Sequence, residues 1–501
     1  MSGPFGIPIF LLTDSYKLSH PYLFPDSKKM VAYSSFRQSY NKGSDERIIF
    51  FGLRYFIENY IDKQWSLEDL EKSKRFFETH NAGFTKFPFP EELFLKMINE
   101  NNGYFPISIY ALEEGTVVYP HVPVMVMVAE EPYSGLITYL EALLTMIWYP
   151  CTVATLSRQC KTIIEKSFEK SVDKEKNFLI NSRLHDFGFR GCTSVEQSIL
   201  GGMAHLLNFE GSDTLSAAYY GQFNWNNGAP IASSIPATEH SVMTSHLNEK
   251  QAILKMIEKF GSGVFACVMD SYDYKVALEK ILPEIASEKV GKGGFMVLRP
   301  DSGDPIKTVL MALNAGDQVF GSTINSKGYK VLNGCGVIQG DGIDIIVLEK
   351  ILDAVIEAGY SSENIAFGMG GGLLQKLNRD TMSFATKLSY IKEKDDSVRL
   401  IAKLPKTDTS KFSLPGQFMV LLDSNNLPKV YPKPEDQVEY EQKYKSNDLL
   451  KLVYNGTKTD KQWLTFDQLK TNINQHWNNC PIKFEPISDQ IKELQNQLKN
   501  K

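Results

Sequence analysis

The chain has 501 residues, a net charge of −5 at pH 7, 43% hydrophobic residues and 23% charged residues. These values are typical of a globular protein with room for two domains, and the mild acidity argues against a nucleic-acid partner. The six cysteines show no C-x-x-C spacing, so free thiols in a reducing cytoplasm are expected rather than a zinc site or disulfides. No apolar run reaches the roughly 18 residues of a membrane helix.

The first 150 residues are predicted to form the N-terminal part of a mixed α+β domain. The apolar start, Met1 to Leu12, lacks the pattern of a signal peptide and is expected to be a core strand. Residues 117–128 alternate with prolines and predict strands with turns. Residues 136–148 predict one buried apolar helix, which Pro150 separates from a second helix at about 153–170.

Four short apolar runs, separated by roughly 30 to 40 residues, each end in a small polar corner that contains or adjoins glycine or aspartate. A strand that ends in such a corner and is followed by a helix is the repeating unit of a (β/α) barrel, in which strand ends carry the active site. Residues 151–384 are therefore predicted to form an α/β barrel domain that binds a phosphorylated sugar. The corners are 268–273, 297–303, 337–342 and 365–372.

Residues 344–358 show the barrel's helical pattern most clearly, because apolar residues line one side and Gly359 follows. Residues 385–501 are predicted to return to the mixed domain. Within them, the Lys-rich stretch at about 391–413 is expected to be an exposed, flexible basic loop. Two strands, at 418–422 and 449–454, and two helices, capped by Thr465 and Ser488, are predicted to follow it.

The corners contain the groups that a sugar phosphate needs. The glycine run 368–372 exposes backbone N–H groups to an anion, although a simple tight turn is the alternative. Arg299 suits phosphate and Asp301 suits ribose hydroxyls, although a structural ion pair between them would explain both. Asp341, between two glycines, can be interpreted in the same two ways.

Two further segments carry candidate residues. In residues 184–191, Phe187 could stack on a flat ring and Arg190 could bind an anion, but composition alone favours Phe187 as a core residue. His240, after Glu239, is by itself more typical of a hydrogen-bonded structural histidine. No spacing typical of metal ligands is present.

Taken together, the motifs resemble the nicotinamide phosphoribosyltransferases, nearly from end to end. This family has the type II phosphoribosyltransferase architecture, an irregular (β/α) barrel joined to a mixed domain built from both chain ends. The resemblance implies a homodimer with shared active sites that makes nicotinamide mononucleotide for NAD salvage. The motifs are Thr13–Lys17, Trp148–Pro150, His185–Gly191, Phe209–Thr214, Pro236–Ser241, Asp270–Asp273, Arg299–Gly303, Ile338–Gly342 and Phe367–Lys376.

The resemblance also implies a role for each end of the substrate. Nicotinamide would lie between Phe187 and Tyr16 of the partner subunit, near Arg299, with its amide donating to Asp213. A nicotinate carboxylate would meet a like charge there, so Asp213 is the expected specificity residue. The phosphoribosyl contacts would be Asp301, Gly340, Asp341, Gly370 and Gly371. The diphosphate and ATP contacts would be Arg37, Arg190, His240, Arg379, Lys387, Lys403 and Lys411, with the loop at 391–413 as a lid.

The implied chemistry needs no protein nucleophile. His240 matches the histidine that the family phosphorylates with ATP, and Mg²⁺ is expected to enter on phosphoribosyl pyrophosphate without direct protein ligands. The expected catalytic residues are His240, Asp301, Arg299 and Asp270, the last also as a carboxylate near the metal. Two positions depart from the family pattern: Met369 replaces a serine, and Arg37 lacks its usual preceding residues.

Three alternatives remain at this point. A nicotinate phosphoribosyltransferase would share the fold and chemistry, but a neutral or basic residue at position 213 would suit it better. A non-catalytic binding protein on the same fold would be expected to lack His240, Arg299 or the glycine run, and all are present. A phosphosugar aldolase or isomerase barrel would need a Schiff-base lysine or a paired acid and base at strand ends, and the only lysine in the four corners, Lys376, already lies in a predicted helix.

Overall fold

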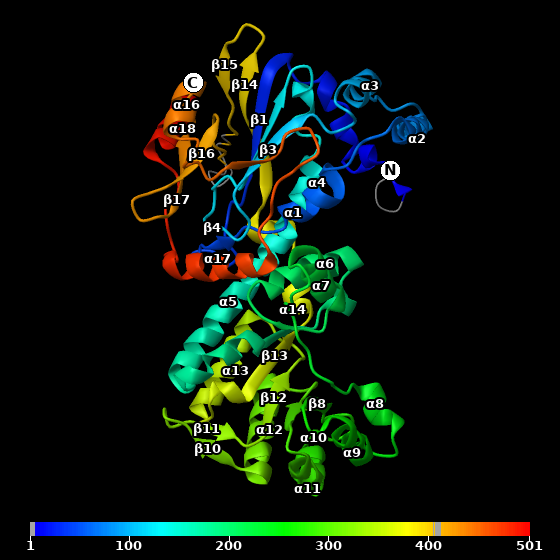
Figure 1. Cartoon of the computed structure of the whole chain (residues 1–501), viewed down its shortest axis with the longest axis vertical. Coiled ribbons are helices and arrows are strands. Elements are labelled where there is room, and N and C mark those ends of the chain that lie inside the picture. The colour runs from blue at the N-terminus through cyan, green and yellow to red at the C-terminus, as the bar shows by residue number, and fades with distance from the viewer. Residues whose placement is uncertain (1–5, 404, 406–411, 501) are drawn as a thin grey trace. The chain divides into compact units, whose positions relative to one another are not determined.

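The computed structural model describes residues 6–403, 405 and 412–500 and forms two compact units (Figure 1). Unit 1 comprises residues 1–152, 378–464 and 471–501, and unit 2 comprises residues 153–377 and 465–470. The predicted domain boundaries, at 150 and 384, stay predictions of the domain organisation.

Unit 2 is built on a six-stranded parallel sheet of order β7-β6-β13-β12-β9-β8. Because β7 and β8 are its two edges, the sheet is an open half-barrel of the predicted type. All four predicted strands of the repeating units are present, so this part of the fold prediction is confirmed. The strands are β6 (Leu184–Asp186), β7 (Gly211–Ser212), β8 (Val264–Val268), β9 (Phe295–Arg299), β12 (Cys335–Gln339) and β13 (Ile365–Met369), with a separate hairpin of β10 (Ser322–Ile324) and β11 (Lys330–Leu332).

Helices connect these strands, and α13 (Ile345–Glu357) shows why they form where they do. The Asp344 carboxylate accepts hydrogen bonds from Ile346 N and Val347 N and so caps the helix. Leu348, Ile351 and their neighbours on the same side are buried, and Gly359 ends the helix with a φ of +83°. The other α-helices are α5 (Trp148–Ser171), α6 (Val195–Leu206), α7 (Leu215–Tyr220), α8 (His240–Ser245), α9 (Glu249–Phe260), α10 (Tyr274–Val276), α11 (Leu282–Lys292), α12 (Pro305–Phe320) and α14 (Gly371–Leu374). The 3₁₀- and π-helical segments are η8 (Lys174–Ser182), η9 (Phe189–Gly191), η10 (Gly221–Trp225), η11 (Ala277–Ile281) and η12 (Ser362–Asn364).

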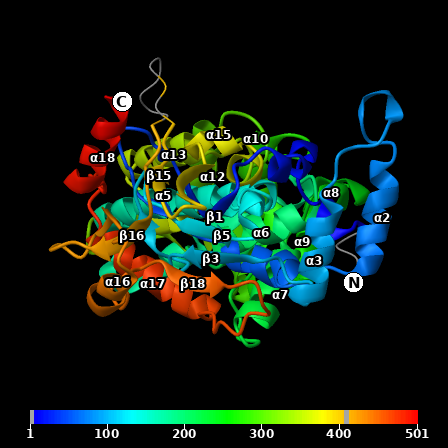
Figure 2. The ribbon, with the colours of Figure 1, turned by 90° about the horizontal axis from the view of Figure 1, so that it is seen from above.

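Unit 1 contains a six-stranded antiparallel sheet of order β15-β14-β1-β5-β3-β18. Figure 2 shows β1, β5 and β3 next to one another in this order. The strands predicted within 117–128 and at 418–422 are confirmed, and the one at 449–454 begins at Lys451. The strands are β1 (Ser27–Ser35), β2 (Ile48–Ile49), β3 (Ile107–Ala111), β4 (Val117–Val118), β5 (Met125–Glu130), β14 (Ala385–Glu393), β15 (Val398–Leu400), β16 (Phe418–Leu422), β17 (Pro428–Pro432) and β18 (Lys451–Tyr454).

The two predicted C-terminal helices are confirmed together with their caps. Gln468 N donates to Thr465 Oγ1 at the start of α17 (Phe466–Asn479), and Ile491 N donates to Ser488 Oγ at the start of α18 (Asp489–Lys499). The remaining α-helices are α1 (Leu53–Phe56), α2 (Leu67–Phe77), α3 (Glu91–Glu100), α4 (Glu141–Thr145), α15 (Arg379–Met382) and α16 (Gln437–Lys443). The short segments are η2 (Ile9–Leu11), η3 (Ser15–Leu18), η4 (His20–Tyr22), η5 (Ile57–Ile61), η6 (Ala82–Phe84) and η7 (Ser134–Leu136).

The prediction of one helix over residues 136–148 is wrong. That stretch is divided into η7, α4 and the first residue of α5, because a run of mostly apolar residues carries no clear periodic signal of where a helix breaks. Pro150 does not separate two helices. It lies in the first turn of α5, where its missing N–H has no intrahelical partner to lose.

Two other local predictions are also wrong. The apolar start forms η2 rather than a strand among its described residues, with Phe10 fully buried. Residues 391–400 belong largely to the β14–β15 hairpin rather than to a loop, and residues 404 and 406–411 lie outside the described part. Among the described residues, no single helix is long and apolar enough to cross a membrane; Ser134–Thr145 and Trp148–Ser171 reach that length and composition only as a bent pair.

Candidate active site

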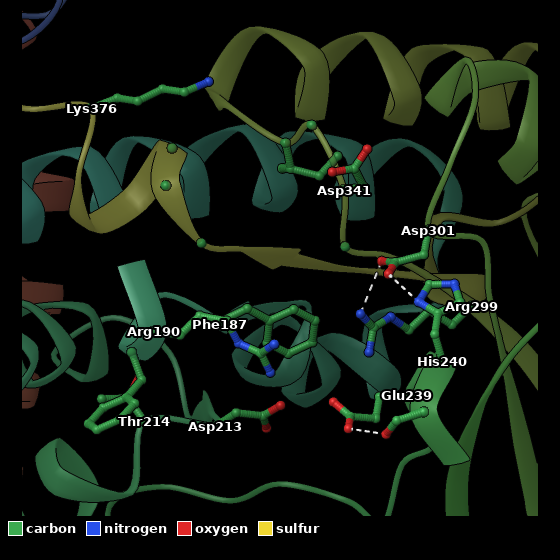
Figure 3. Close-up of a pocket in the computed structure, with 18 residues that line it drawn as sticks. Phe187, Arg190, Asp213, Thr214, Glu239, His240, Arg299, Asp301, Asp341 and Lys376 are labelled. Carbon is green, nitrogen blue, oxygen red and sulfur yellow. Dashed lines mark hydrogen bonds and ion pairs between the residues drawn. The ribbon is translucent and has the colours of Figure 1, made fainter. Parts of the chain in front are cut away.

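Unit 2 holds a cavity of about 780 Å³ lined by residues from the carboxyl ends of its strands (Figure 3). Phe187 follows β6, Asp213 follows β7, Arg299 ends β9, and the glycine corners follow β12 and β13. The sheet therefore brings together residues that lie far apart in the sequence, as the barrel prediction required. The lining residues are Phe187, Phe189, Arg190, Asp213, Thr214, Glu239, His240, Ser241, Arg299, Asp301, Gly340, Asp341, Gly342, Ile343, Gly370, Gly371, Gly372 and Lys376.

The Phe187 ring is only half buried and lies on a floor of glycine backbone. A Cβ atom at Gly368 would lie 2.0 Å from Phe187 Cε2, and one at Gly340 would lie 3.2 Å from the same atom. Phe187 N donates to Met369 O at 3.1 Å, which fixes the main chain beneath the ring. The Arg299 guanidinium lies 5.6 Å from the ring centre. Phe187 thus lines the cavity and also packs against the buried core residues Ala266, Val297 and Ile338, so its role at the site stays a prediction.

Arg299, Asp301 and His240 form a connected group at one side of the cavity (Figure 3). Arg299 Nη2 donates to Asp301 Oδ1 at 3.0 Å, and His240 Nδ1 lies 3.7 Å from Asp301 Oδ2. Arg299 Nε has no hydrogen-bond partner among the described residues. Arg299 therefore forms the ion pair foreseen as an alternative, and still has donor capacity for an anion.

Asp270 holds the other side of the His240 ring. Its Oδ1 lies 3.2 Å from His240 Nε2, while Oδ2 accepts from Asp301 N at 2.9 Å and from Ser302 Oγ at 2.5 Å. The carboxylate is almost fully buried (2% exposed), whereas the His240 side chain is 48% exposed. A buried, well-bonded carboxylate that holds an exposed imidazole is an arrangement that orients the ring for reaction.

The glycine run forms the end of β13 and the start of the short helix α14. Gly372 is required by close approach, because a Cβ there would lie 2.3 Å from Ile343 O. The Gln375 amide donates to Gly188 O at 2.9 Å and ties this segment to the turn after Phe187. Gly370 and Gly371 expose backbone to the cavity, as a phosphate-binding loop would.

Asp213 is exposed in the cavity and anchored at both its main chain and its side chain. Its N–H donates to Asp186 O at 2.9 Å, and its Oδ1 accepts a short hydrogen bond from Ser234 Oγ. The anchored carboxylate can accept a further donor from a ligand. This is the placement that the predicted amide contact needs.

The remaining predicted cations belong to unit 1. Burial is the main cause that lowers the pKa of Lys387, and the charge of Glu141 opposes it. Three nearby cations lower the pKa of Lys387 further, namely Arg37, Lys403 and Arg379. Each of these three cations therefore lies close enough to Lys387 to act on its charge. Arg37 lines a second cavity of about 590 Å³, Tyr16 is 56% exposed, and Lys411 lies outside the described residues.

Several lining residues were given no site role in the sequence analysis. Glu239 accepts a short hydrogen bond from Ser241 Oγ at the rim, and Thr214 and Lys376 also line the cavity. The position of Glu239 next to His240 was the available signal for it. Thr214 and Lys376 end two of the quoted motifs but were given no role, and Lys376 lies just after α14 rather than in a helix as predicted.

Comparison with known proteins identifies the family. A model described as the nicotinate phosphoribosyltransferase (NAPRTase) family matches residues 182–457, which is more than half of the chain. A model of the nicotinamide phosphoribosyltransferase N-terminal domain matches residues 8–109. The chain belongs to this phosphoribosyltransferase family.

Relatives in the family support this at the level of the whole chain. The chain is 38% identical over 422 residues to a nicotinamide phosphoribosyltransferase of Xanthomonas campestris pv. campestris (strain 8004), covering 83% of this chain and 88% of the relative. It is 31% identical over 449 residues to that of Mycoplasma genitalium, covering 83% and 96%. The predicted family is confirmed.

Two solved structures show the same fold. Nicotinate-nucleotide pyrophosphorylase from Pyrococcus furiosus matches with a TM-score of 0.61 at 16% identity, over 96% of this chain and 97% of that one. Human nicotinic acid phosphoribosyltransferase matches with a TM-score of 0.62 at 16% identity, over 97% and 100%. The architecture of this phosphoribosyltransferase kind is therefore also confirmed.

Proposed function

We propose that this protein transfers the 5-phosphoribosyl group from phosphoribosyl pyrophosphate to nicotinamide, giving nicotinamide mononucleotide and pyrophosphate. The observation that carries the proposal is one cavity lined by Phe187, Asp213 and the Arg299–Asp301–His240 group together with the glycine run. The cavity joins a ring face and an amide acceptor to groups suited to ribose and phosphate. Relatives named nicotinamide phosphoribosyltransferase support the choice of ring.

The pyridine ring is proposed to stack on Phe187, near the Arg299 guanidinium, with Tyr16 of the partner subunit on its other face. Its carboxamide NH₂ donates to Asp213. A nicotinate carboxylate at about 4 Å from Asp213 would be opposed by about 4 kcal/mol at an effective dielectric constant of about 20. Asp213 therefore selects the amide by repelling the acid.

The phosphoribosyl group is proposed to occupy the other side of the cavity. Asp301 and Asp341 accept the ribose hydroxyls, and the glycines at 340, 370 and 371 allow close approach of the sugar and its 5′-phosphate. Arg190 and Arg299 bind diphosphate oxygens, with Arg37, Arg379, Lys387, Lys403 and Lys411 as the proposed cations of the mixed domain.

The reaction follows from this placement. The ring nitrogen bonds to C1 of the ribose as the C1–O bond to pyrophosphate breaks, through a state resembling an oxocarbenium ion. The protein orients the two reactants and stabilises negative charge on the leaving diphosphate. No protein group forms a covalent bond to the sugar.

We further propose that ATP phosphorylates His240. Asp270 and Asp301 hold the imidazole from its two nitrogen atoms, so that its orientation is fixed before reaction. The phosphoryl group moves from ATP to an imidazole nitrogen, and ADP leaves. The added negative charge then lies near the diphosphate, where it strengthens binding of a Mg²⁺-bound substrate.

Mg²⁺ is proposed to enter as part of the substrate complex. A homodimer is proposed because Tyr16 is needed from a partner subunit. A reducing, cytoplasmic location is also proposed, and the six free cysteines support it.

The decisive experiment measures turnover of nicotinamide and nicotinate with phosphoribosyl pyrophosphate and Mg²⁺, with separation of the two possible mononucleotides. We expect nicotinamide mononucleotide as the main product and faster turnover with ATP present. Faster turnover of nicotinate would assign the alternative nicotinate activity. Binding of both substrates with no turnover of either would assign a non-catalytic binding protein.

A further inference from the structure

A fully buried carboxyl group lies directly behind the proposed pyridine subsite. Asp186 ends β6 immediately before Phe187 and is 0% exposed. Its carbonyl oxygen accepts from Asp213 N at 2.9 Å, and the next residue in the chain donates to Met369 O at 3.1 Å. Asp186 thus precedes the proposed stacking residue, Phe187, and its main chain is hydrogen-bonded to the proposed amide acceptor, Asp213.

The Asp186 side chain also shapes the turn that presents Phe187. Its Oδ1 accepts from Gly188 N at 2.7 Å, the two-residue spacing of an Asx turn. Gly188 packs tightly in that turn, because a Cβ there would lie 2.6 Å from Leu374 Cδ1. The carboxyl group therefore fixes the main chain on both sides of Phe187.

The second oxygen of Asp186 is unpaired. Oδ2 has no hydrogen-bond partner among the described residues, and a Cβ at Gly202 of α6 would lie 3.1 Å from it. Burial raises the pKa of Asp186 to about 6, with the Gly188 N–H and the Thr214 hydroxyl lowering it and the charge of Asp213 raising it. Thr214 Oγ1 lies near the carboxyl group without meeting the geometry of a hydrogen bond.

Among the described residues, no cation contributes to the pKa shift of this carboxylate. The titratable groups that act on it or respond to it are Asp213 and the Cys192 thiol, whose own pKa is raised mainly by burial. The neighbouring elements contribute uncharged residues, namely Gly202 of α6, Met369 of β13 and Leu374 near Gly188. Two carboxylates therefore act on the same wall of the cavity.

This charge matters because the cavity also contains cations. Arg190 and Arg299 line it and would attract a carboxylate on the ring. Asp213 opposes that attraction at contact distance, and a charge at Asp186 opposes it from behind the wall, where low polarity weakens screening. The same charge favours the pyridinium ring, because that ring becomes positive as its nitrogen bonds to the sugar.

We propose that Asp186 is a positioning and specificity-determining residue of the pyridine subsite: its carboxyl group fixes the turn that presents Phe187, and its negative charge acts with Asp213 against a ring that bears a carboxylate. The proposal rests on the proposed nicotinamide phosphoribosyltransferase activity. It predicts that preference for nicotinamide over nicotinate depends on pH through a residue that contacts neither substrate.

The test compares the wild type with Asp186→Asn, which keeps an acceptor for Gly188 N and removes the charge. The ratio of kcat/KM for nicotinamide to kcat/KM for nicotinate is measured from about pH 5.5 to about pH 8. Titration of groups that contact only the phosphoribosyl substrate changes kcat/KM for nicotinamide and for nicotinate by the same factor, so their effect cancels in the ratio. We expect the wild-type ratio to fall by roughly tenfold as the pH drops through about 6, and the variant's ratio to be low and nearly independent of pH.

The control is Asp173→Asn, at a carboxylate that accepts from Ser326 N at 3.1 Å and does not line the cavity. It should behave as the wild type. The proposal would be overturned if the wild type and Asp186→Asn had the same nicotinamide-to-nicotinate ratio of kcat/KM at every pH. Such equality includes the case in which the variant loses kcat/KM equally for both substrates, which is what a merely structural role would give. If the variant does not fold, a pH-independent ratio in the wild type overturns it. Absence of any nicotinamide mononucleotide from the wild type would instead refute the proposed function.

Discussion

The glycine beneath the Phe187 ring provides the sharpest steric prediction. In Gly368→Ala, the new Cβ would lie 2.0 Å from Phe187 Cε2 and 2.1 Å from Cδ2, against an ordinary carbon–carbon contact of about 3.5 to 4 Å. The main chain cannot retreat easily, because Phe187 N is bonded to Met369 O. The ring must therefore move by about 1.5 Å or leave its rotamer, which alone costs about 0.5 to 1.5 kcal/mol.

The kinetic effect follows from that displacement. Loss of one stacking face is worth about 0.5 to 1.5 kcal/mol, and a misplacement of about 1 Å can cost about 100-fold in rate. We expect kcat/KM for nicotinamide to fall by about 10- to 100-fold, with a much smaller change in the KM for phosphoribosyl pyrophosphate. Steady-state kinetics with each substrate varied in turn measures both.

Two matched variants make the test graded. Gly340→Ala places a Cβ 3.2 Å from Phe187 Cε2 and should have an intermediate effect. Gly291→Ala, in α11, meets nothing within 4 Å and should leave kinetics unchanged. If Gly368→Ala folds with an unchanged melting temperature and keeps its KM for nicotinamide within about twofold, Phe187 does not form the ring face.

Three further predictions concern carboxylates of the same unit. Asp213→Asn should lower the nicotinamide-to-nicotinate ratio of kcat/KM by at least about tenfold, because the repulsion of the acid is removed; an unchanged ratio would remove Asp213 from that role. Asp270→Asn should reduce ³²P transfer from ATP to His240 by about 100-fold while the KM for nicotinamide stays the same; equal phosphorylation in both proteins would contradict the orienting role. The pKa of Asp186 is about 6 in the folded protein, against an ordinary value of 3.8. As the pH rises from about 4 to about 6, Asp186 therefore loses its proton in the unfolded chain before it does so in the folded protein, and the free energy of unfolding decreases. Replacing it with Asn should remove a loss on the order of 3 kcal/mol over that range, measured by urea unfolding at the two ends, and equal pH dependence of both proteins would contradict the raised pKa.

The strand-and-corner pattern predicted the catalytic unit well because each signal is local. An apolar run of five residues, a polar corner and an amphipathic helix such as residues 345–357 each follow from short-range periodicity. The order of the strands does not, since it depends on which edges pair. Sequence alone therefore predicted Arg299 and Asp301 as site residues but could not show which carboxylates hold His240.

Sequence patterns did not predict the secondary structure correctly in two stretches that lack a clear periodicity of apolar residues. The stretch 136–148 is apolar on almost every face, so nothing in it marks the break before α5. The stretch 391–400 is rich in charged residues, yet β14 and β15 pair there, and ion pairs such as Lys392–Asp396 and Arg399–Glu393 join charged side chains within the hairpin. Asp186 was overlooked for a related reason: a carboxylate in a turn motif predicts a polar surface position, and only the fold places it inside.

The fold alone cannot decide the choice of substrate, because two solved structures that share it are named for nicotinate or nicotinic acid, whereas two relatives in sequence are named for nicotinamide. Nor can the size of the cavity decide it, since the two rings differ by one amide for one carboxylate. What remains is the local balance of charge. In the proposed complex, Arg190 and Arg299 of the cavity attract an acid, whereas Asp213 at its surface and the buried Asp186 oppose one. Because Asp186 is buried and its pKa is raised to about 6, its charge changes with pH, and we therefore expect the preference between the two rings to depend on pH.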